Sequence, residues 1–115
     1  MPKKYSGKIK DFIQWFEIPV LDINRAVQFY NDIYEMDMKV VQTSNHSMAF
    51  FPTNNGVGGS LVQGNGCIPT ENGTLVYLNG RNDLNNILKR VENAGGRVVL
   101  EKTLINKESG YFALF

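Results

Sequence analysis

The chain has 115 residues, of which 43% are hydrophobic and 20% are charged, and its formal net charge at neutral pH is +1. This length and composition are typical of one globular domain and exclude an intrinsically disordered chain. The near-balanced charge argues against nucleic acid as a partner. The single cysteine, Cys67, excludes an internal disulfide framework and a cysteine-rich zinc site.

The first eleven residues are predicted to form a basic N-terminal tail, because they contain four lysines. No continuous apolar stretch of the signal-peptide type follows this tail. No apolar run approaches the roughly 20 residues that a membrane-spanning helix needs. We therefore expect a cytoplasmic protein that has no membrane partner.

Two segments have the periodicity of amphipathic helices. In residues 22–35 and again in residues 83–94, the apolar side chains recur every three or four positions and form one stripe. Asp22 and Asp83 stand where an N-cap carboxylate accepts hydrogen bonds from the first free N–H groups. The glycine pair at 95–96 is typical of a helix end.

Short β-rich runs separated by turn residues predict the strands. These runs are residues 12–20, 39–43, 47–51, 59–62, 74–78, 97–104 and 111–115. The triplet Asn54-Asn55-Gly56 suits a turn between two antiparallel strands.

The two halves of the chain also match in sequence. Both predicted helices open with a similar triplet, Asp22-Ile23-Asn24 and Asp83-Leu84-Asn85, and the strands after them open with Lys39-Val40-Val41 and Arg97-Val98-Val99. Two copies are too few for a solenoid. The pattern predicts one α+β domain made of two βαβββ modules, at about residues 12–63 and 74–115, and the last strand of the second module is absent from the given chain.

Five segments in this order resemble the vicinal oxygen chelate superfamily, in its glyoxalase / bleomycin resistance protein-like branch. They are Ile18-Pro19-Val20-Leu21-Asp22 with the helix that follows, Gly58-Gly59-Ser60-Leu61-Val62, Gly73-Thr74-Leu75-Val76-Tyr77-Leu78, Gly95-Gly96-Arg97-Val98-Val99, and Gly110-Tyr111-Phe112-Ala113-Leu114-Phe115. The nearest members are those described as related to lactoylglutathione lyase. The resemblance covers about residues 12–115.

This resemblance implies two modules that curl around a shared cavity, and a homodimer. It also implies a divalent metal, bound by one side chain each on the first, fourth and fifth strands and by a glutamate on an eighth strand. The corresponding positions hold Trp15 on the first strand, Gly59 and Ser60 on the fourth, and Thr74 on the fifth. Because indole offers no lone pair and hydroxyls are weak ligands, we expect no metal and no other cofactor.

By its place in the module, Trp15 is predicted to line the cavity, with Thr74 opposite it in the second module. Glu17 lies two residues after Trp15 and shares its strand face, whereas Phe16 and Ile18 are expected to pack on the helix. In a partly apolar cleft, Glu17 would have a raised pKa and could act as a base. The alternative is a strand-edge carboxylate paired with lysine or arginine. Glu101, at a similar depth in a predicted strand of the second module, has the same two interpretations.

We therefore expect a glyoxalase-like protein that binds a small organic molecule in its cavity without the family metal site. One alternative is a metal-dependent lyase or isomerase of the lactoylglutathione lyase type. Another is sequestration of a drug or antibiotic. Most of the other strand aromatics are interpreted as core; these residues are Phe50, Phe51, Tyr77, Tyr111, Phe112 and Phe115.

Overall fold

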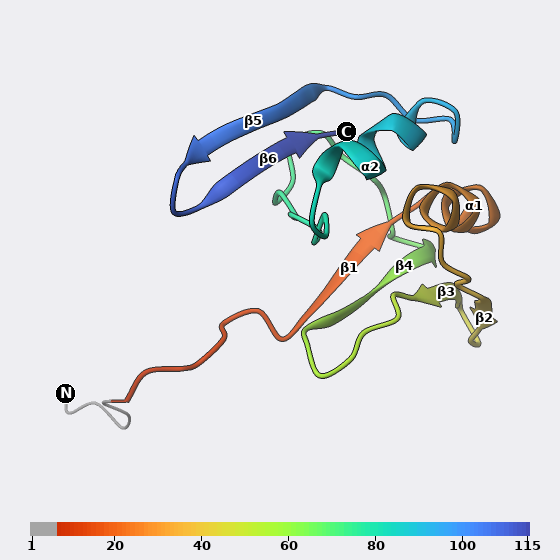
Figure 1. Ribbon diagram of the computed structural model, residues 1–115. Helices are drawn as coiled ribbons and strands as arrows, with labels where there is room; N and C mark the ends of the chain where they lie inside the picture. The colour runs from red at the N-terminus through yellow and green to blue at the C-terminus, as the bar shows by residue number, and fades with distance from the viewer. Residues whose placement is uncertain (1–6) are drawn as a thin grey trace.

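The computed structural model describes residues 7–115, which form an α+β arrangement of two helices and six strands (Figure 1). The elements, in chain order, are β1 (Trp15–Pro19), α1 (Ile23–Tyr34), β2 (Val40–Gln42), β3 (His46–Phe50), β4 (Gly58–Gly64), α2 (Leu84–Val91), β5 (Leu100–Asn106) and β6 (Gly110–Leu114). The order agrees with two related modules, of which the second is the less complete.

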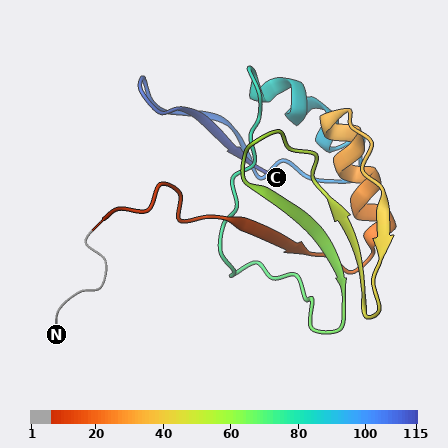
Figure 2. The ribbon, with the colours of Figure 1, turned by 90° about the horizontal axis from the view of Figure 1, so that it is seen from below.

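The first module forms a mixed four-stranded sheet in the order β1-β4-β3-β2, which curves beside α1 (Figure 2). β4 runs parallel to β1, with Ile18 opposite Leu61, and antiparallel to β3. The predicted turn between β3 and β4 is confirmed, because Asn55 has a positive φ of 65° there. Small, asparagine-rich turns of this kind favour antiparallel return of the chain.

Helix α1 covers one face of this sheet and closes the larger core. The Asp22 carboxylate accepts hydrogen bonds from the backbone N–H groups of Asn24 and Arg25, at 3.1 and 3.2 Å, as predicted for an N-cap. The helix buries Ile23 against Leu61, and Ile18 packs against the same cluster. The prediction that this face of β1 packs on the helix is therefore confirmed.

Helix α2 begins after Asp83, whose carboxylate accepts a hydrogen bond of 3.0 Å from the backbone N–H of Asn85. The turn that follows the helix reaches Gly95, whose φ of +101° is a conformation that glycine adopts without strain. The buried side chains Ile87 and Val91 pack against Ile33 of α1. The two helices thus form the smaller core and join the modules.

The second module consists of α2 and the antiparallel hairpin of β5 and β6. The predicted strand at residues 74–78 is wrong, because this segment is irregular and joins no sheet. Its counterpart β1 is a strand because it pairs with β4. The described residues of the second module contain no strand that corresponds to β4, so residues 74–78 have no ladder partner.

Residues 7–14, which precede β1, extend away from the two sheets (Figure 1). The strand predicted from residue 12 begins only at Trp15, and Phe12 is 84% exposed. Residues 1–6 of the predicted basic tail lie outside the described residues. Neither helix in residues 7–115 has the length and apolar character required to cross a membrane.

Candidate functional site

Trp15 and Glu17 lie side by side on the face of β1 that points away from α1. The indole Nε1–H of Trp15 donates a hydrogen bond of 3.3 Å to Oε2 of Glu17. The Trp15 ring centroid is 6.0 Å from that of Phe50 on β3. No ion pair with lysine or arginine forms at Glu17 within residues 7–115, so this carboxylate orients the indole instead.

Gly58 on β4 makes room for the indole. A Cβ atom at this position would lie 2.9 Å from Cζ3 of Trp15, closer than real Cβ atoms approach. The Trp15 ring therefore leans from β1 across β4 toward Phe50. Any larger residue at position 58 would push the ring away from the sheet.

Ser60 is the polar centre of the same sheet face. It stands opposite Glu17 on β1 and Phe50 on β3, so its side chain points to the face that carries Trp15. The residue is completely buried, and no hydrogen-bond partner for its Oγ occurs in the described part of the chain. Buried hydroxyls are nearly always hydrogen-bonded. Among the described residues, this unpartnered hydroxyl is therefore an exception to that rule.

The side chains at the positions expected for the family metal do not fit a divalent ion. Trp15 offers only an N–H donor, which Glu17 already accepts, and Ser60 offers one hydroxyl. Thr74 is exposed in the irregular segment. Residues 7–115 contain no group of three or more His, Cys, Asp or Glu side chains that could hold a metal.

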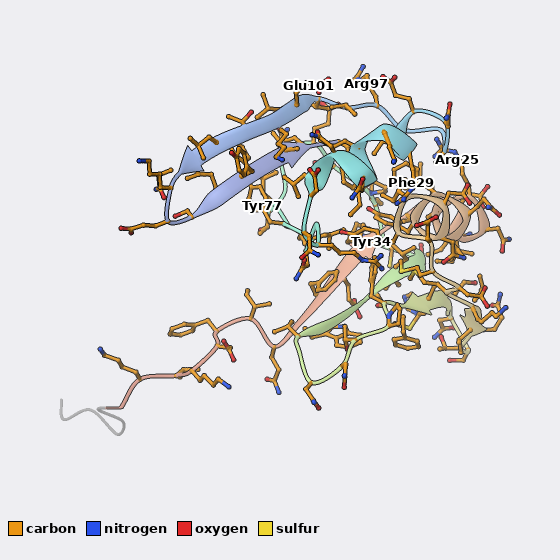
Figure 3. The ribbon with its side chains drawn as sticks, in the orientation of Figure 1. Arg25, Phe29, Tyr34, Tyr77, Arg97 and Glu101 are labelled. Atoms are coloured by element: carbon orange, nitrogen blue, oxygen red, sulfur yellow. The ribbon has the colours of Figure 1, made fainter. Side chains whose placement is uncertain are left out.

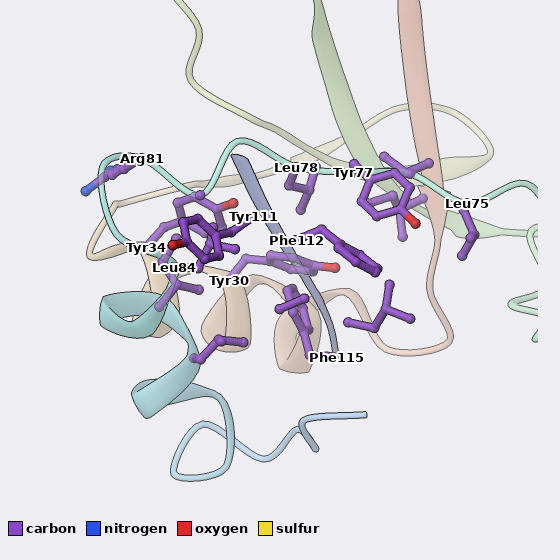
Figure 4. A pocket seen from close by; sticks show the side chains of 17 residues that line it. Tyr30, Tyr34, Leu75, Tyr77, Leu78, Arg81, Leu84, Tyr111, Phe112 and Phe115 are labelled. Carbon is purple, nitrogen blue, oxygen red and sulfur yellow. The ribbon is translucent and has the colours of Figure 1, made fainter. Parts of the chain in front are cut away.

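A separate cavity of about 360 Å³ lies where the two modules meet, among α1, α2, residues 75–81 and β6 (Figure 4). Its wall is mainly apolar and aromatic. The labelled lining residues in Figure 4 are Tyr30, Tyr34, Leu75, Tyr77, Leu78, Arg81, Leu84, Tyr111, Phe112 and Phe115.

Polar groups on the wall of this cavity are few. Burial raises the pKa of Tyr30 to about 12, with a smaller contribution from Tyr34. The hydroxyl of Tyr34 donates a hydrogen bond of 2.7 Å to the backbone oxygen of Asn79, and the Arg81 guanidinium lies 5.6 Å from the Tyr34 ring centroid. Tyr34 lies on α1, and Tyr77 lies on the segment that precedes α2 (Figure 3).

The structure brings two of the three predicted ligand-binding residues together, since Trp15 and Glu17 are hydrogen-bonded neighbours. Thr74 lies in the segment that forms no strand, and none of the three lines the cavity of Figure 4. The sequence interpretation missed Ser60 as a polar centre and Tyr34 as a wall residue. The alternation along residues 58–62 puts Ser60 on the same face as Gly58, but only the pairing of Ser60 with Glu17 identifies this as the Trp15 face.

A family model described as the Glyoxalase/Bleomycin resistance protein/Dioxygenase superfamily matches residues 12–115. Among solved structures, the chain is similar to hypothetical protein SA1046 from S. aureus, with a TM-score of 0.56 and 20% sequence identity over 93% of this chain and 85% of that chain. This likeness supports the fold alone. The search of curated proteins found no match. From the family match over residues 12–115, the chain belongs to the Glyoxalase/Bleomycin resistance protein/Dioxygenase superfamily.

Proposed function

We propose that this protein binds a small organic molecule, without a divalent metal, on the sheet face that carries Trp15 and Glu17. The observation that carries this proposal is the buried Ser60 hydroxyl, which has no hydrogen-bond partner among the described residues. Leaving a buried polar group unpaired costs about 1–3 kcal/mol. A ligand that supplies the missing hydrogen bond recovers this free energy on binding.

The chemistry of the surrounding side chains favours a planar, uncharged ligand. Trp15 and Phe50 are each about half exposed and offer ring faces for stacking. Glu17 carries a negative charge on the same face, which disfavours an anionic ligand. Since Ser60 is fully covered in this structure, a ligand reaches its hydroxyl when a neighbouring side chain turns away.

Benzamide is a suitable probe because it is flat, uncharged and able to both donate and accept hydrogen bonds. Trp15 is the only tryptophan, so its indole N–H resonance reports binding at this face without ambiguity. We expect a saturable shift of this resonance on titration with benzamide. Trp15→Ala should weaken benzamide binding by roughly 1–3 kcal/mol, the usual contribution of an aromatic anchor. Because this variant has no indole, its binding is measured from the backbone amide resonances of β4.

Ser60→Ala separates the functional role of the hydroxyl from a structural one. Removing an unsatisfied buried hydroxyl is expected to leave the melting temperature unchanged or raise it, while weakening benzamide binding. Ser47→Ala is the matched control, because Ser47 lies on β3 next to Met48 and on the opposite face from Phe50. The proposal fails if benzamide causes no saturable shift, or if Ser60→Ala and Ser47→Ala bind it equally.

Two activities remain alternatives to simple binding. A metal-dependent lyase or isomerase would turn over the hemithioacetal of methylglyoxal and glutathione when supplied with Zn²⁺ or Ni²⁺. A sequestration protein would bind bleomycin stoichiometrically and leave it chemically unchanged. Turnover in the first assay would overturn the metal-free proposal. Tight bleomycin binding that shifts the Trp15 indole resonance would name the ligand class at the proposed face.

We also propose that the protein forms a homodimer. β1 and β2 are the two edge strands of the four-stranded sheet, and Val41 on β2 is 45% exposed. Exposed edges promote association unless they are covered. Light scattering at tens of micromolar protein should give twice the mass of the 13.0 kDa chain. A monomer mass at that concentration would contradict this proposal.

A further inference from the structure

The middle of the chain contains four asparagines that are each followed by glycine. The pairs are Asn55-Gly56, Asn65-Gly66, Asn72-Gly73 and Asn79-Gly80. Asparagine is among the chemically labile residues of proteins. When glycine follows, no Cβ shields the glycine nitrogen, and this nitrogen can attack the side-chain amide carbon of the asparagine. The attack requires rotation of the asparagine backbone, so a turn that is held in place protects its pair.

Asn79-Gly80 is held at both reacting groups. The side-chain Oδ1 of Asn79 accepts a hydrogen bond of 2.8 Å from the backbone N–H of Arg81. The backbone oxygen of Asn79 accepts one of 2.7 Å from the hydroxyl of Tyr34. Gly80 also packs directly against the side chain of Leu84. Rotation at this pair therefore breaks two hydrogen bonds.

Two further pairs have one restraint each. The backbone N–H of Cys67 donates a hydrogen bond of 3.1 Å to the backbone oxygen of Gly64, which closes a turn around Asn65-Gly66. The backbone N–H of Asn72 donates one of 3.1 Å to Oγ1 of Thr70. These hydrogen bonds restrict the backbone at both pairs.

Asn55-Gly56 has no comparable restraint. Within residues 7–115, neither Asn55 nor Gly56 makes a hydrogen bond, and no hydrogen bond closes a tight turn around them. Both residues are exposed, and a Cβ at Gly56 would meet only open space. Asn55 also has a φ of 65°, a left-handed conformation that is unfavourable for residues other than glycine. This pair is therefore the freest of the four to rotate.

We propose that Asn55-Gly56, in the turn between β3 and β4, is a site of spontaneous deamidation. The Gly56 nitrogen gives its proton to solvent and attacks Cγ of Asn55, and the side-chain nitrogen takes up a proton and leaves as ammonia. Water then opens the cyclic succinimide at either of its carbonyl groups. The products are aspartate and isoaspartate, and the reaction consumes one water for each ammonia released.

The turn lies where a change in the backbone reaches the start of β4 (Figure 1). β4 begins at Gly58, opposite Trp15 on β1, and a Cβ at Gly58 would lie 2.9 Å from Cζ3 of Trp15. Isoaspartate adds a negative charge and inserts a methylene group into the main chain, so it should displace Gly58 and the Trp15 ring. Aspartate adds only the charge. The modification does not depend on the ligand proposed for this face.

The test compares the four pairs within one sample of the 115-residue chain. The folded protein is incubated at mildly alkaline pH, and tandem mass spectrometry locates each product. We expect Asn55 to react on the order of tenfold faster than Asn79, which must first break two hydrogen bonds. In concentrated urea, the four pairs should react at similar rates, because glycine follows each asparagine and no folded structure restrains them.

Three variants separate the chemistry from the fold. Gly56→Ala should slow the reaction at Asn55 on the order of tenfold, since the new Cβ shields the nitrogen, and the open space there leaves the fold intact. Asn72→Gln, in another exposed turn, is the matched control and should leave the rate at Asn55 unchanged. Tyr34→Phe should speed the reaction at Asn79 roughly fivefold, because it removes one hydrogen bond.

The indole N–H resonance of Trp15 reports the structural consequence. The purified isoaspartyl form should shift this resonance relative to the parent protein. Asn55→Asp carries the charge without the inserted methylene group and should shift it less.

Four results would overturn the proposal. Equal rates at Asn55 and Asn79 in the folded chain would show that the turn is not selectively reactive. An unchanged rate in Gly56→Ala would exclude attack by the Gly56 nitrogen. An unchanged rate at Asn79 in Tyr34→Phe would show that hydrogen bonds do not set the order of reaction. An unshifted indole resonance in the isoaspartyl form would show that the turn does not act on β4.

Discussion

β1 and residues 74–78 occupy corresponding places in the two modules, yet they differ in structure. Both segments precede a helix that is capped by an aspartate, and both are rich in residues that favour strands. β1 is hydrogen-bonded to β4 along its length, whereas residues 74–78 join no sheet. The difference lies in the neighbour and not in the segment itself.

The same contrast appears in burial. Leu61 on β4 is completely buried between β1 and β3, whereas Leu75 in the unpaired segment is 66% exposed. Strand propensity mostly reflects packing against cross-strand neighbours. A segment with suitable residues therefore becomes a strand only where such a neighbour exists, and the first module supplies one.

The largest expected effect follows from this difference in burial. Leu61→Ala should lower the free energy of unfolding by about 2–5 kcal/mol, since it removes a fully buried side chain and leaves a cavity. Leu75→Ala should change it by about 0.5 kcal/mol or less, as is usual for exposed positions. Urea denaturation followed by circular dichroism measures both. Equal losses for the two leucines would contradict the contrast between the modules.

Much of the fold could be predicted from the sequence because its signals are local. The stripes of α1 and α2 and their caps at Asp22 and Asp83 depend on spacing within a single segment. The state of residues 74–78 could not be predicted this way, because it depends on a pairing partner far away in the chain. Strand propensity alone predicts a strand at residues 74–78, where the structure has none.

The helix caps permit a second comparison of the modules. Asp22→Ala should destabilise the chain by about 1 kcal/mol, because two backbone N–H groups at the start of α1 lose their acceptor. Asp22→Asn is the control and should restore most of the loss. Thermal unfolding measures both variants, and the account would be wrong if Asp22→Ala matched the parent protein.

The cap of α2 has a further role that the cap of α1 lacks. Asp83 also pairs with Lys102 on β5, at 3.1 Å, and so ties the helix to the hairpin of the second module. Hydrogen bonds from the backbone of Asn85 and from Lys102 lower the pKa of the Asp83 carboxyl below its usual value of 3.8. The ionised form is thus favoured in the folded state.

This lowered pKa predicts a small dependence of stability on pH. The stabilisation from Asp83 is fully present above its unfolded pKa, about 3.8, and is lost as the pH falls through the lower folded value. Between pH 5 and pH 2.5, Asp83→Asn should therefore lose less stability than the parent in urea denaturation. An identical decline in both proteins would show that Asp83 contributes nothing to the pH dependence.

The candidate site was only partly predictable from the sequence. The period of two along β1 put Trp15 and Glu17 on one face, and their hydrogen bond agrees with that prediction. The role of Ser60 depends on the register of β4 against β1 and β3, which no local pattern encodes. Thr74 would lie opposite Trp15 only if residues 74–78 formed a strand, and they do not.

Hydrogen exchange of the free protein tests the contrast between the two modules most directly. The amides of residues 59–62, which lie between two strands, should exchange only through global unfolding, while those of residues 75–78 should exchange at least a hundredfold faster. The comparison needs no variant, because both segments report from the same sample. Equal protection of the two segments would contradict the account, since residues 75–78 would then be paired as firmly as β4.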